Sequence, residues 1–483
     1  MKKKNLIILS AISALFSVYS CNKLSEDPKA IIVQGQFYKT SNDAISAVTA
    51  VYSSLNTDPG GDFPMYGRQL YFMADAATDD ETEGNAASNP DVRAMGSITY
   101  IANNNRILGN WTQHYRGIDW ANVAIDNIAT MQIDTTLRNR LVRESKFIRA
   151  LLYFNLVRFF GDVPLVLHQA TSVAETNIPR TPAAQVYAQI ISDLKDAENL
   201  PANYSGNDIG RATSGAAKTL LAKVYLTQKD WTNAGAKLLE VINGPYGYGL
   251  FSNYADVFNK STKNGKEHIF SVQFLSNSGA NNSRDRIMTD VFSGFSTKIP
   301  PDLPADSSLY KSFAKTDTRK GVTYFTTLTN PSTGLPYKFK YIGLRKFVDT
   351  TQLLTPVESG INFPVLRYAD VLLMYAEVLN EQSGPTADAY SAINQVRERA
   401  KLPDLTANLS QSDFRDSVYR ERRWEFVQEG QRWFDLVRTG RLVQALKTVT
   451  AKAPAASDKD NLFPIPQAEI NVNPKITQNT GWN

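Results

Sequence analysis

Near its C-terminal end the chain reads Glu421-Arg422-Arg423-Trp424-Glu425-Phe426-Val427-Gln428-Glu429-Gly430-Gln431-Arg432-Trp433-Phe434-Asp435-Leu436-Val437-Arg438-Thr439-Gly440-Arg441. Apolar residues recur three positions apart, as in Trp424 with Val427 and Trp433 with Leu436, which is the spacing of neighbours on one helix face. Gly430 interrupts this pattern. The spacing therefore predicts two helical segments that meet at this glycine.

The same stretch has a dense alternation of acidic and basic side chains. Burying so many charges is costly unless each acid pairs with a base and both are hydrogen-bonded. An ion-pair network between helices is therefore expected. We hypothesise that Glu425 or Glu429 pairs with an arginine of this stretch or with Arg397 or Arg399.

The N-terminus has the features of a bacterial export signal. Three lysines precede an apolar run from Leu6 to Val18, which is shorter than the roughly 20 residues that a membrane span needs. The run leads to Cys21, the one cysteine of the chain. This arrangement resembles a bacterial lipobox, in which the cysteine is lipidated and the peptide before it is removed. The alternative is an ordinary secretory signal that leaves a free thiol.

We accordingly divide the chain into a signal peptide (residues 1–20), the lipidated cysteine with a tether (residues 21–40) and a folded domain (residues 41–483). The acidic cluster Ser25-Glu26-Asp27 in the tether resembles a surface-export signal, and a solvated linker is the alternative. Loss of the three signal-peptide lysines reduces the formal net charge from +5 to +2, which does not favour a nucleic-acid-binding protein. With Cys21 lipidated no thiol remains for a disulfide, so stability has to come from a large core.

Apolar spacing predicts amphipathic helices over much of the remaining chain. Ile45 and Val48 mark a helix that begins at Ser41, and a longer helix is expected to end at Gly161 and Pro164. Further helices are expected over residues 111–125, 183–200 and 363–377.

Two helical pairs have the spacing of tetratricopeptide repeats. Leu221, Tyr225 and Ala234 fit the first pair, and Ala376 opens a second, looser one. Such pairs stack because neither helix of a pair can bury its apolar face alone. The predicted fold class is mainly α, with a tetratricopeptide-type helical scaffold, long loops and a few short strands.

Two long insertions, at about residues 58–105 and 251–362, lack helical periodicity. The first is rich in acidic residues but lacks the alternating pattern of a calcium loop, so we interpret it as a solvated loop and leave a metal ion as the alternative. The second contains alternating stretches such as His268 to Phe274, which predict short strands. Loops this long in a compact domain are usually functional.

Five stretches together resemble the SusD/RagB family of surface lipoproteins from Bacteroidetes. They are residues 421–441, the helix ending in Gly161-Asp162-Val163-Pro164, residues 363–377, residues 393–400, and residues 462–470 with Gln478-Asn479. The resemblance spans essentially the whole mature chain and implies a SusD-like fold. It also implies that the charged side chains of residues 421–441 have a structural role. Ion-pair networks shift pKa values as catalytic sites do, so dense charge alone does not indicate a catalytic site.

The resemblance implies a function in nutrient uptake. The chain looks like glycan-binding proteins that cap a SusC-like TonB-dependent outer-membrane transporter and hand oligosaccharides to it, although some members take peptides. It therefore implies a lipoprotein anchored in the outer membrane through Cys21 and facing the cell exterior. The implied partners are the transporter and an oligosaccharide or peptide, with no cofactor and no nucleic acid.

Recognisable catalytic motifs are absent from the sequence. The three histidines, His114, His168 and His268, do not have the spacing of zinc ligands, and neither a nucleophile elbow nor a phosphate-binding loop is present. We therefore expect a protein that is not an enzyme. A glycoside hydrolase remains an alternative, because the spacing of its two carboxylates is set in space and not in sequence. A purely structural surface protein is a third possibility.

The ligand surface is expected on residues 58–105 and 279–345. All six tryptophans lie outside these regions, so stacking against a ligand would fall to tyrosine and phenylalanine. Any one of these aromatics could instead be a core residue. The candidate ligand-binding residues are Tyr66, Tyr71, Asp79, Arg93, Tyr100, Asn282, Arg284, Tyr324, Phe325, Tyr341 and Arg345.

Overall fold

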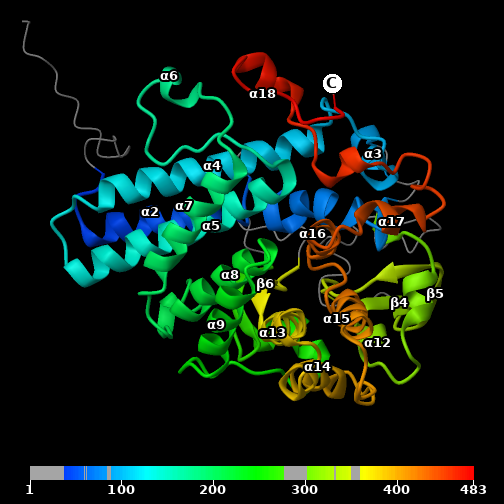
Figure 1. Ribbon diagram of the computed structural model, residues 1–483. Coiled ribbons are helices and arrows are strands. Elements are labelled where there is room, and N and C mark those ends of the chain that lie inside the picture. Colours follow the sequence, from blue (N-terminus) through cyan, green and yellow to red (C-terminus); the bar gives the residue numbers. More distant parts are fainter. Residues whose placement is uncertain are drawn as a thin grey trace, which may run out of the picture.

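The computed structural model describes residues 37–58, 60, 63–83, 87, 89–276, 302–330, 333–349 and 359–482. Within these ranges the protein is mainly helical, with three short two-stranded sheets (Figure 1). Each helix in these ranges is too short or too polar to cross a membrane. The predicted signal peptide and Cys21 lie outside the described residues.

Four helices form the N-terminal layer: α2 (Ser41–Ser53), α4 (Asn105–Ile128), α5 (Thr135–Phe160) and α7 (Ala183–Ala197). Helix α5 contacts each of the other three, so it is the centre of the layer. Thr40 begins α2 with a capping box, in which its side chain and that of Asp43 each bond to the other's backbone. Gly161 ends α5 with a φ of +71°, which confirms the predicted helix end.

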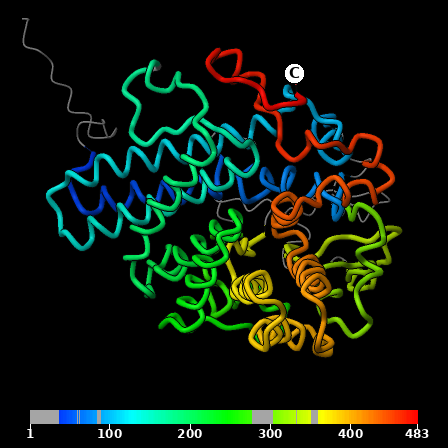
Figure 2. Tube along the Cα trace, in the orientation of Figure 1, coloured from blue at the N-terminus to red at the C-terminus, as the bar shows by residue number. Residues whose placement is uncertain are grey.

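The predicted tetratricopeptide-type pairs are α8 (Ser214–Thr227) with α9 (Trp231–Ile242), and α13 (Tyr368–Ser383) with α14 (Ala387–Arg399). Contacts run from α7 to α8, from α9 to α13 and from α13 to α15 (Gln411–Glu425). Neighbouring pairs therefore bury each other's apolar faces in one continuous core, as expected for stacked helical repeats (Figure 2).

The other helices are short and connect or cover this scaffold. They are α3 (Pro90–Ser97), α6 (Val173–Thr176), α11 (Ser308–Ser312), α12 (Arg319–Thr323), α16 (Arg432–Arg438), α17 (Leu442–Lys447) and α18 (Gln467–Val472). Two π-helical turns (Met65–Gln69 and Phe72–Ala76) and four 3-10 turns (Gly206–Asp208, Tyr254–Phe258, Lys260–Thr262 and Asp458–Asn461) complete the helical elements.

The strands pair antiparallel across long stretches of sequence. The pairs are β1 (Glu81–Glu83) with β3 (Asp302–Pro304), β2 (His268–Val272) with β6 (Phe363–Arg367), and β4 (Tyr324–Thr329) with β5 (Pro336–Leu344). The β4–β5 hairpin has its own small apolar core. Pairing of Glu81 with Pro304 joins the two insertions, on which the ligand surface is expected.

Residues 363–377 were expected to be one helix, and this prediction is wrong for the first five residues. Phe363–Arg367 is strand β6, fully buried and paired with β2, and the helix begins only at Tyr368. A short apolar run that is buried on both faces has no alternation, so its sequence pattern does not distinguish a strand from a helix.

The acidic stretch of the first insertion is not a solvated loop. Asp79, Asp80 and Glu81 are buried, and two arginines from the C-terminal stretch reach the two aspartates. Arg432 Nε and Nη2 each lie 2.8 Å from the Asp79 carboxylate, and Arg423 Nε lies 2.6 Å from Asp80 Oδ1. Burial would raise the pKa of Asp79, but the two guanidinium groups outweigh it and lower the pKa to about 2.

The predicted ion-pair network is present at the end of α15. Glu425 accepts hydrogen bonds from Arg399 Nη2 at 2.5 Å, Arg367 Nη1 at 2.6 Å and Arg319 Nη1 at 3.0 Å, which confirms the expected pair with Arg399. Glu429 contacts Arg367 Nε at 2.7 Å and Lys346 Nζ at 2.8 Å. Sequence analysis missed Arg319, Lys346 and Arg367, because each lies far from the stretch along the chain.

Two helices flank Gly430 as predicted, but they do not meet at it: α15 already ends at Glu425, and Gly430 lies in the turn that precedes α16. Its φ of +66° is in the left-handed region that favours glycine, and its N–H donates to Asp75 Oδ1 at 3.1 Å. The chain then returns to the N-terminal layer, where the Trp482 ring stacks on Tyr100 with centroids 5.3 Å apart. The C-terminal end accordingly lies beside the segment that follows α3 (Figures 1 and 2).

Candidate functional site

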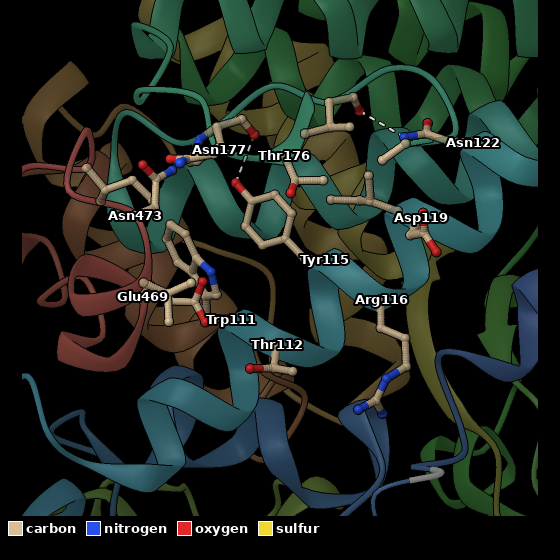
Figure 3. A pocket seen from close by; sticks show the side chains of 16 residues that line it. Trp111, Thr112, Tyr115, Arg116, Asp119, Asn122, Thr176, Asn177, Glu469 and Asn473 are labelled. Carbon is tan, nitrogen blue, oxygen red and sulfur yellow. Dashed lines mark hydrogen bonds between the residues drawn. The ribbon is translucent and has the colours of Figure 1, made fainter. Parts of the chain in front are cut away.

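One face of α4 forms the floor of a surface pocket (Figure 3). Trp111, Tyr115, Ile118 and Asn122 succeed one another at intervals of three or four residues, so they lie along the same side of the helix. Asn104 fixes the start of this helix, because its side chain accepts hydrogen bonds from the backbone N–H groups of Arg106 and Ile107.

The segment that follows Gly161 forms the second wall. Tyr115 Oη donates to the Pro164 carbonyl at 2.8 Å, and Asn122 Nδ2 donates to the Val166 carbonyl at 3.0 Å. Figure 3 shows both side chains reaching from α4 to this segment. These bonds hold the backbone of residues 164–166 against the helix and leave Thr176 and Asn177 on the other side of the opening.

The third wall comes from α18 and the residues after it. Asn473 Nδ2 donates to the Ile178 carbonyl at 2.8 Å, which ties this wall to the second one. Glu469 faces the pocket beside Trp111 (Figure 3). Val472 is 79% exposed at the rim, where it offers an apolar contact.

The three walls enclose a cavity of about 440 Å³. This volume is within the range of about 300–1,000 Å³ that is usual for small-molecule sites. Aromatic and aliphatic side chains cover much of the lining, with amide and carboxyl groups placed between them.

Two carboxyl groups line the pocket without a salt bridge to a described cation. Burial raises the pKa of Glu469, although a hydrogen bond from the Trp111 side chain opposes the shift, and burial also raises the pKa of Asp119. Arg116, the one cation among the described residues that line the pocket, is held by Asp58 at 2.6 Å. Asn177 Oδ1 is buried and has no hydrogen-bond partner among the described residues.

This arrangement suits a ligand that is neutral, rich in hydroxyl groups and apolar on one face. Such a ligand can donate hydrogen bonds to the carboxyl groups of Glu469 and Asp119 and to the side-chain amide oxygen of Asn177. Trp111 and Tyr115 contribute aromatic surface. Sequence analysis recognised Trp111 and Tyr115 only as helix residues. No sequence signal connected them with Asn177 or Glu469, because the three walls come from segments that are distant along the chain.

The aromatic candidates of the first insertion lie in the core. Tyr66, Tyr71 and Tyr100 are 4%, 2% and 3% exposed. Tyr66 Oη accepts a hydrogen bond from Asn155 Nδ2 at 3.0 Å, and burial raises the pKa of Tyr66 to about 12. These rings have no face open to a ligand in this structure, which corrects their interpretation as stacking surfaces.

Two of the three aromatic candidates of the second insertion are also buried. Tyr324 and Phe325 are 3% and 4% exposed in the small core of the β4–β5 hairpin, so the same correction applies to them. Tyr341 is half-buried beside Phe339, with ring centroids 5.5 Å apart.

The polar candidates fall into three groups. Asp79 is buried in the ion pairs described above, so it is not a rim residue. Arg93 and Arg345 are exposed, and Arg345 Nη1 donates to the Gly321 carbonyl at 3.2 Å. Asn282 and Arg284 lie outside the described residues.

Comparison with known proteins identifies sequences and structures similar to this chain. The sequence model described as "SusD family" matches residues 258–482, and the one described as "Starch-binding associating with outer membrane" matches residues 61–226. A SusD-like protein of Formosa agariphila is 28% identical over 100% of this chain and 99% of its own length.

Two solved structures are similar over nearly the whole chain. A SusD superfamily protein from Bacteroides vulgatus has a TM-score of 0.78 and 28% identity, and the match covers 92% of this chain and 100% of that one. A protein described as a laminarin binding SusD-like protein has a TM-score of 0.74 and 27% identity, with coverage of 92% and 100%.

Proposed function

Because this chain belongs to the SusD/RagB family, we propose that it binds oligosaccharides at the outer membrane and delivers them to a partner SusC-like TonB-dependent transporter. The observation that supports this proposal most strongly is the pocket on α4, whose aromatic surface and hydrogen-bond acceptors suit a sugar. A laminarin-binding relative of the same fold supports the ligand class. The description of the family that matches residues 61–226 supports the outer membrane as the location.

The pocket on α4 is the main proposed ligand site. Arg93, Tyr341 and Arg345 remain proposed contacts in the two insertions, because they keep exposed surface. Asn282 and Arg284 remain proposed ligand contacts on the evidence of the sequence alone.

A glycan screen by isothermal titration calorimetry tests the proposed function. The screen should contain laminarihexaose and hexasaccharides of other linkages, together with a set of extended peptides. Saccharide binding is the expected result, and binding of peptides alone would favour the peptide-binding alternative. Absence of any binding would favour a purely structural protein.

The same samples test the hydrolase alternative. Asp119 and Glu469 both line the pocket with raised pKa, and a glycoside hydrolase also uses two carboxyl groups around its substrate. We expect the bound saccharide to be recovered intact, as measured by the release of reducing ends over a long incubation.

Variants of the pocket are expected to bind saccharide more weakly without losing stability. Asn177→Ala removes one hydrogen-bond acceptor, and Glu469→Gln replaces one carboxyl oxygen with an NH2 donor; each change should cost about 0.5–1.5 kcal/mol, so the dissociation constant should rise roughly tenfold. The control is Asn243→Ala, since Asn243 is exposed at the end of α9 and lines none of the pockets discussed here. Equal affinities for the double variant and the control would place the site elsewhere.

The lipid anchor is proposed from the lone cysteine after the apolar signal. Cys21→Ala should abolish metabolic labelling with a palmitate analogue and release the protein from the outer membrane. Cys21→Ser is a second variant of closer size, with the same expected result. Undiminished labelling of either variant would end the lipoprotein interpretation.

A further inference from the structure

We propose that a groove along strand β2 is a second saccharide-binding site, which rests on the proposed function but uses different residues from the pocket on α4. The groove consists of two adjoining hollows of about 260 Å³ and 230 Å³. Both are lined by the turn Ile209-Gly210-Arg211 and by Phe270 and Ser271 of β2. Each hollow alone is smaller than a usual ligand site, so a ligand of usual size would have to occupy both.

A pair of stacked tyrosines forms one side of this β2 groove. The rings of Tyr246 and Tyr248 are 5.3 Å apart at an interplanar angle of 20°. Tyr248 is held at the start of α8, where its hydroxyl lies 3.0 Å from Thr213 Oγ1 and where a Cβ on Gly215 would come within 2.6 Å of that hydroxyl. Because residue 215 is a glycine, the aromatic pair can pack directly against α8.

Ile209 adds apolar surface in the middle of the groove. Its side chain is 52% exposed, although it lines both hollows. Sugars present C–H faces that pack against such surfaces, while their hydroxyl groups need hydrogen-bond partners around them. The β2 groove provides both kinds of contact.

Three buried polar atoms among the groove residues lack a protein partner. Ser271 Oγ, His268 Nδ1 and Asn56 Oδ1 have no hydrogen-bond partner among the described residues, and these side chains are 3%, 8% and 9% exposed. His268 Nε2 lies 2.9 Å from the Val257 carbonyl, so Nε2 carries the proton and Nδ1 is left as an acceptor. Asn56 Nδ2 donates to the Gln273 carbonyl at 2.8 Å, which leaves its Oδ1 unused.

Buried polar groups normally have partners, so this set points to a ligand that supplies them. Two of the three atoms are acceptors and the third is a hydroxyl, which matches a ligand rich in hydroxyl groups. The cationic side chains of the groove lining are Arg211 and Lys266, and Lys266 is exposed. Arg211 is already paired, because its Nη1 lies 2.9 Å from Glu144 and its Nε lies 2.8 Å from Asp208.

The test uses the full mature chain and the tightest-binding hexasaccharide of the glycan screen. Calorimetry should give two sites on the wild-type protein. The pocket variant Asn177→Ala with Glu469→Gln should retain the second site, and adding Ser271→Ala or Tyr246→Ala should weaken that site by roughly threefold to tenfold.

Ser271→Ala separates ligand binding from folding. Because the Ser271 hydroxyl has no protein partner, its removal should leave the melting temperature unchanged or higher. The matched control is Ser145→Ala, in which a buried serine of α5 loses a hydroxyl that donates to the Leu141 carbonyl at 3.0 Å. That control should lower stability slightly and leave both affinities unchanged.

Four results would overturn this inference. A single site that the pocket variant abolishes would refute the β2 groove while leaving the proposed function intact. Unchanged affinity of the second site in both groove variants, or displacement of the sugar there by an extended peptide but not by other sugars, would also refute it. If no hexasaccharide binds the wild-type protein, the proposed function and this inference fail together.

Discussion

Glu425→Gln is expected to lower the free energy of unfolding by about 3–5 kcal/mol, because it removes the shared partner of three buried arginines. Arg319, Arg367 and Arg399 all contact this carboxylate, and Glu425 itself has no exposed surface. Denaturant unfolding followed by circular dichroism measures the change. The matched control is Asp416→Asn, which breaks a pair with Arg441 whose side chains are 52% and 40% exposed, and should cost at most about 1 kcal/mol.

The effect of this substitution should depend on pH. Burial would raise the pKa of Glu425, but the guanidinium groups of Arg399, Arg367 and Arg319 outweigh it and hold the pKa well below its usual range. A carboxyl group with a lowered pKa in the folded state contributes stability that is complete above its unfolded pKa of about 4.3 and is lost as the pH falls. The difference between wild type and Glu425→Gln should therefore shrink below about pH 4, whereas a constant difference down to pH 3 would contradict this assignment.

Lys452→Met is expected to destabilise the protein by about 3 kcal/mol or more, since it leaves three buried carbonyl groups without their donor. Lys452 has no exposed surface, and its Nζ donates to the carbonyls of Ala76, Thr78 and Glu81 at 2.6, 2.5 and 2.7 Å. These carbonyls belong to the segment that carries Asp79 and strand β1. We therefore expect faster amide hydrogen exchange in residues 76–83 as well as a lower melting temperature.

A control and a pH series make this prediction specific. Lys447→Met replaces an exposed lysine of α17 and should change the unfolding free energy by less than about 0.5 kcal/mol. Burial lowers the pKa of Lys452 to about 7, although Asp79 and Glu81 oppose the shift. Between that pKa and the unfolded value of about 10.4 the unfolded chain binds the additional proton, so wild-type stability should rise with pH relative to Lys452→Met. A gap between their unfolding free energies that stays constant from pH 7 to 9 would show that the folded lysine keeps its charge, because both states would then hold the proton over this range.

Local patterns predicted the helical scaffold well, because helix spacing and stop signals are properties of neighbouring residues. Gly161 marks the end of a helix in the sequence and in the structure, and Gly430 lies in the turn between two helices. Local patterns do not predict which distant segments pair with each other. Strand β6 looked like the start of a helix because its partner β2 is about one hundred residues away, and nothing in either segment identifies the other.

The candidate site was harder to predict for a related reason. An aromatic residue in an irregular segment has the same sequence pattern whether its ring faces a ligand or the core. Tyr66 and Tyr100 lie in such segments, yet Phe363 packs beside the first ring and Trp482 on the second. The pocket on α4, in contrast, takes Asn177 and Glu469 from segments that only the folded chain brings together.

The pairing of Asp79 and Asp80 with distant arginines also bears on the order of folding. Arg423 and Arg432 follow these aspartates by 343 and 353 residues, and Lys452 follows its three carbonyls by 371 to 376 residues. Contacts between residues so far apart in the sequence have a large entropic cost of loop closure and form slowly. A chain in which the N-terminal layer has collapsed first would bury carboxylates that still lack their counter-charges. We therefore expect the first insertion to become stable only when residues 423–452 dock, and a nascent chain to be most exposed to aggregation or proteolysis before that step.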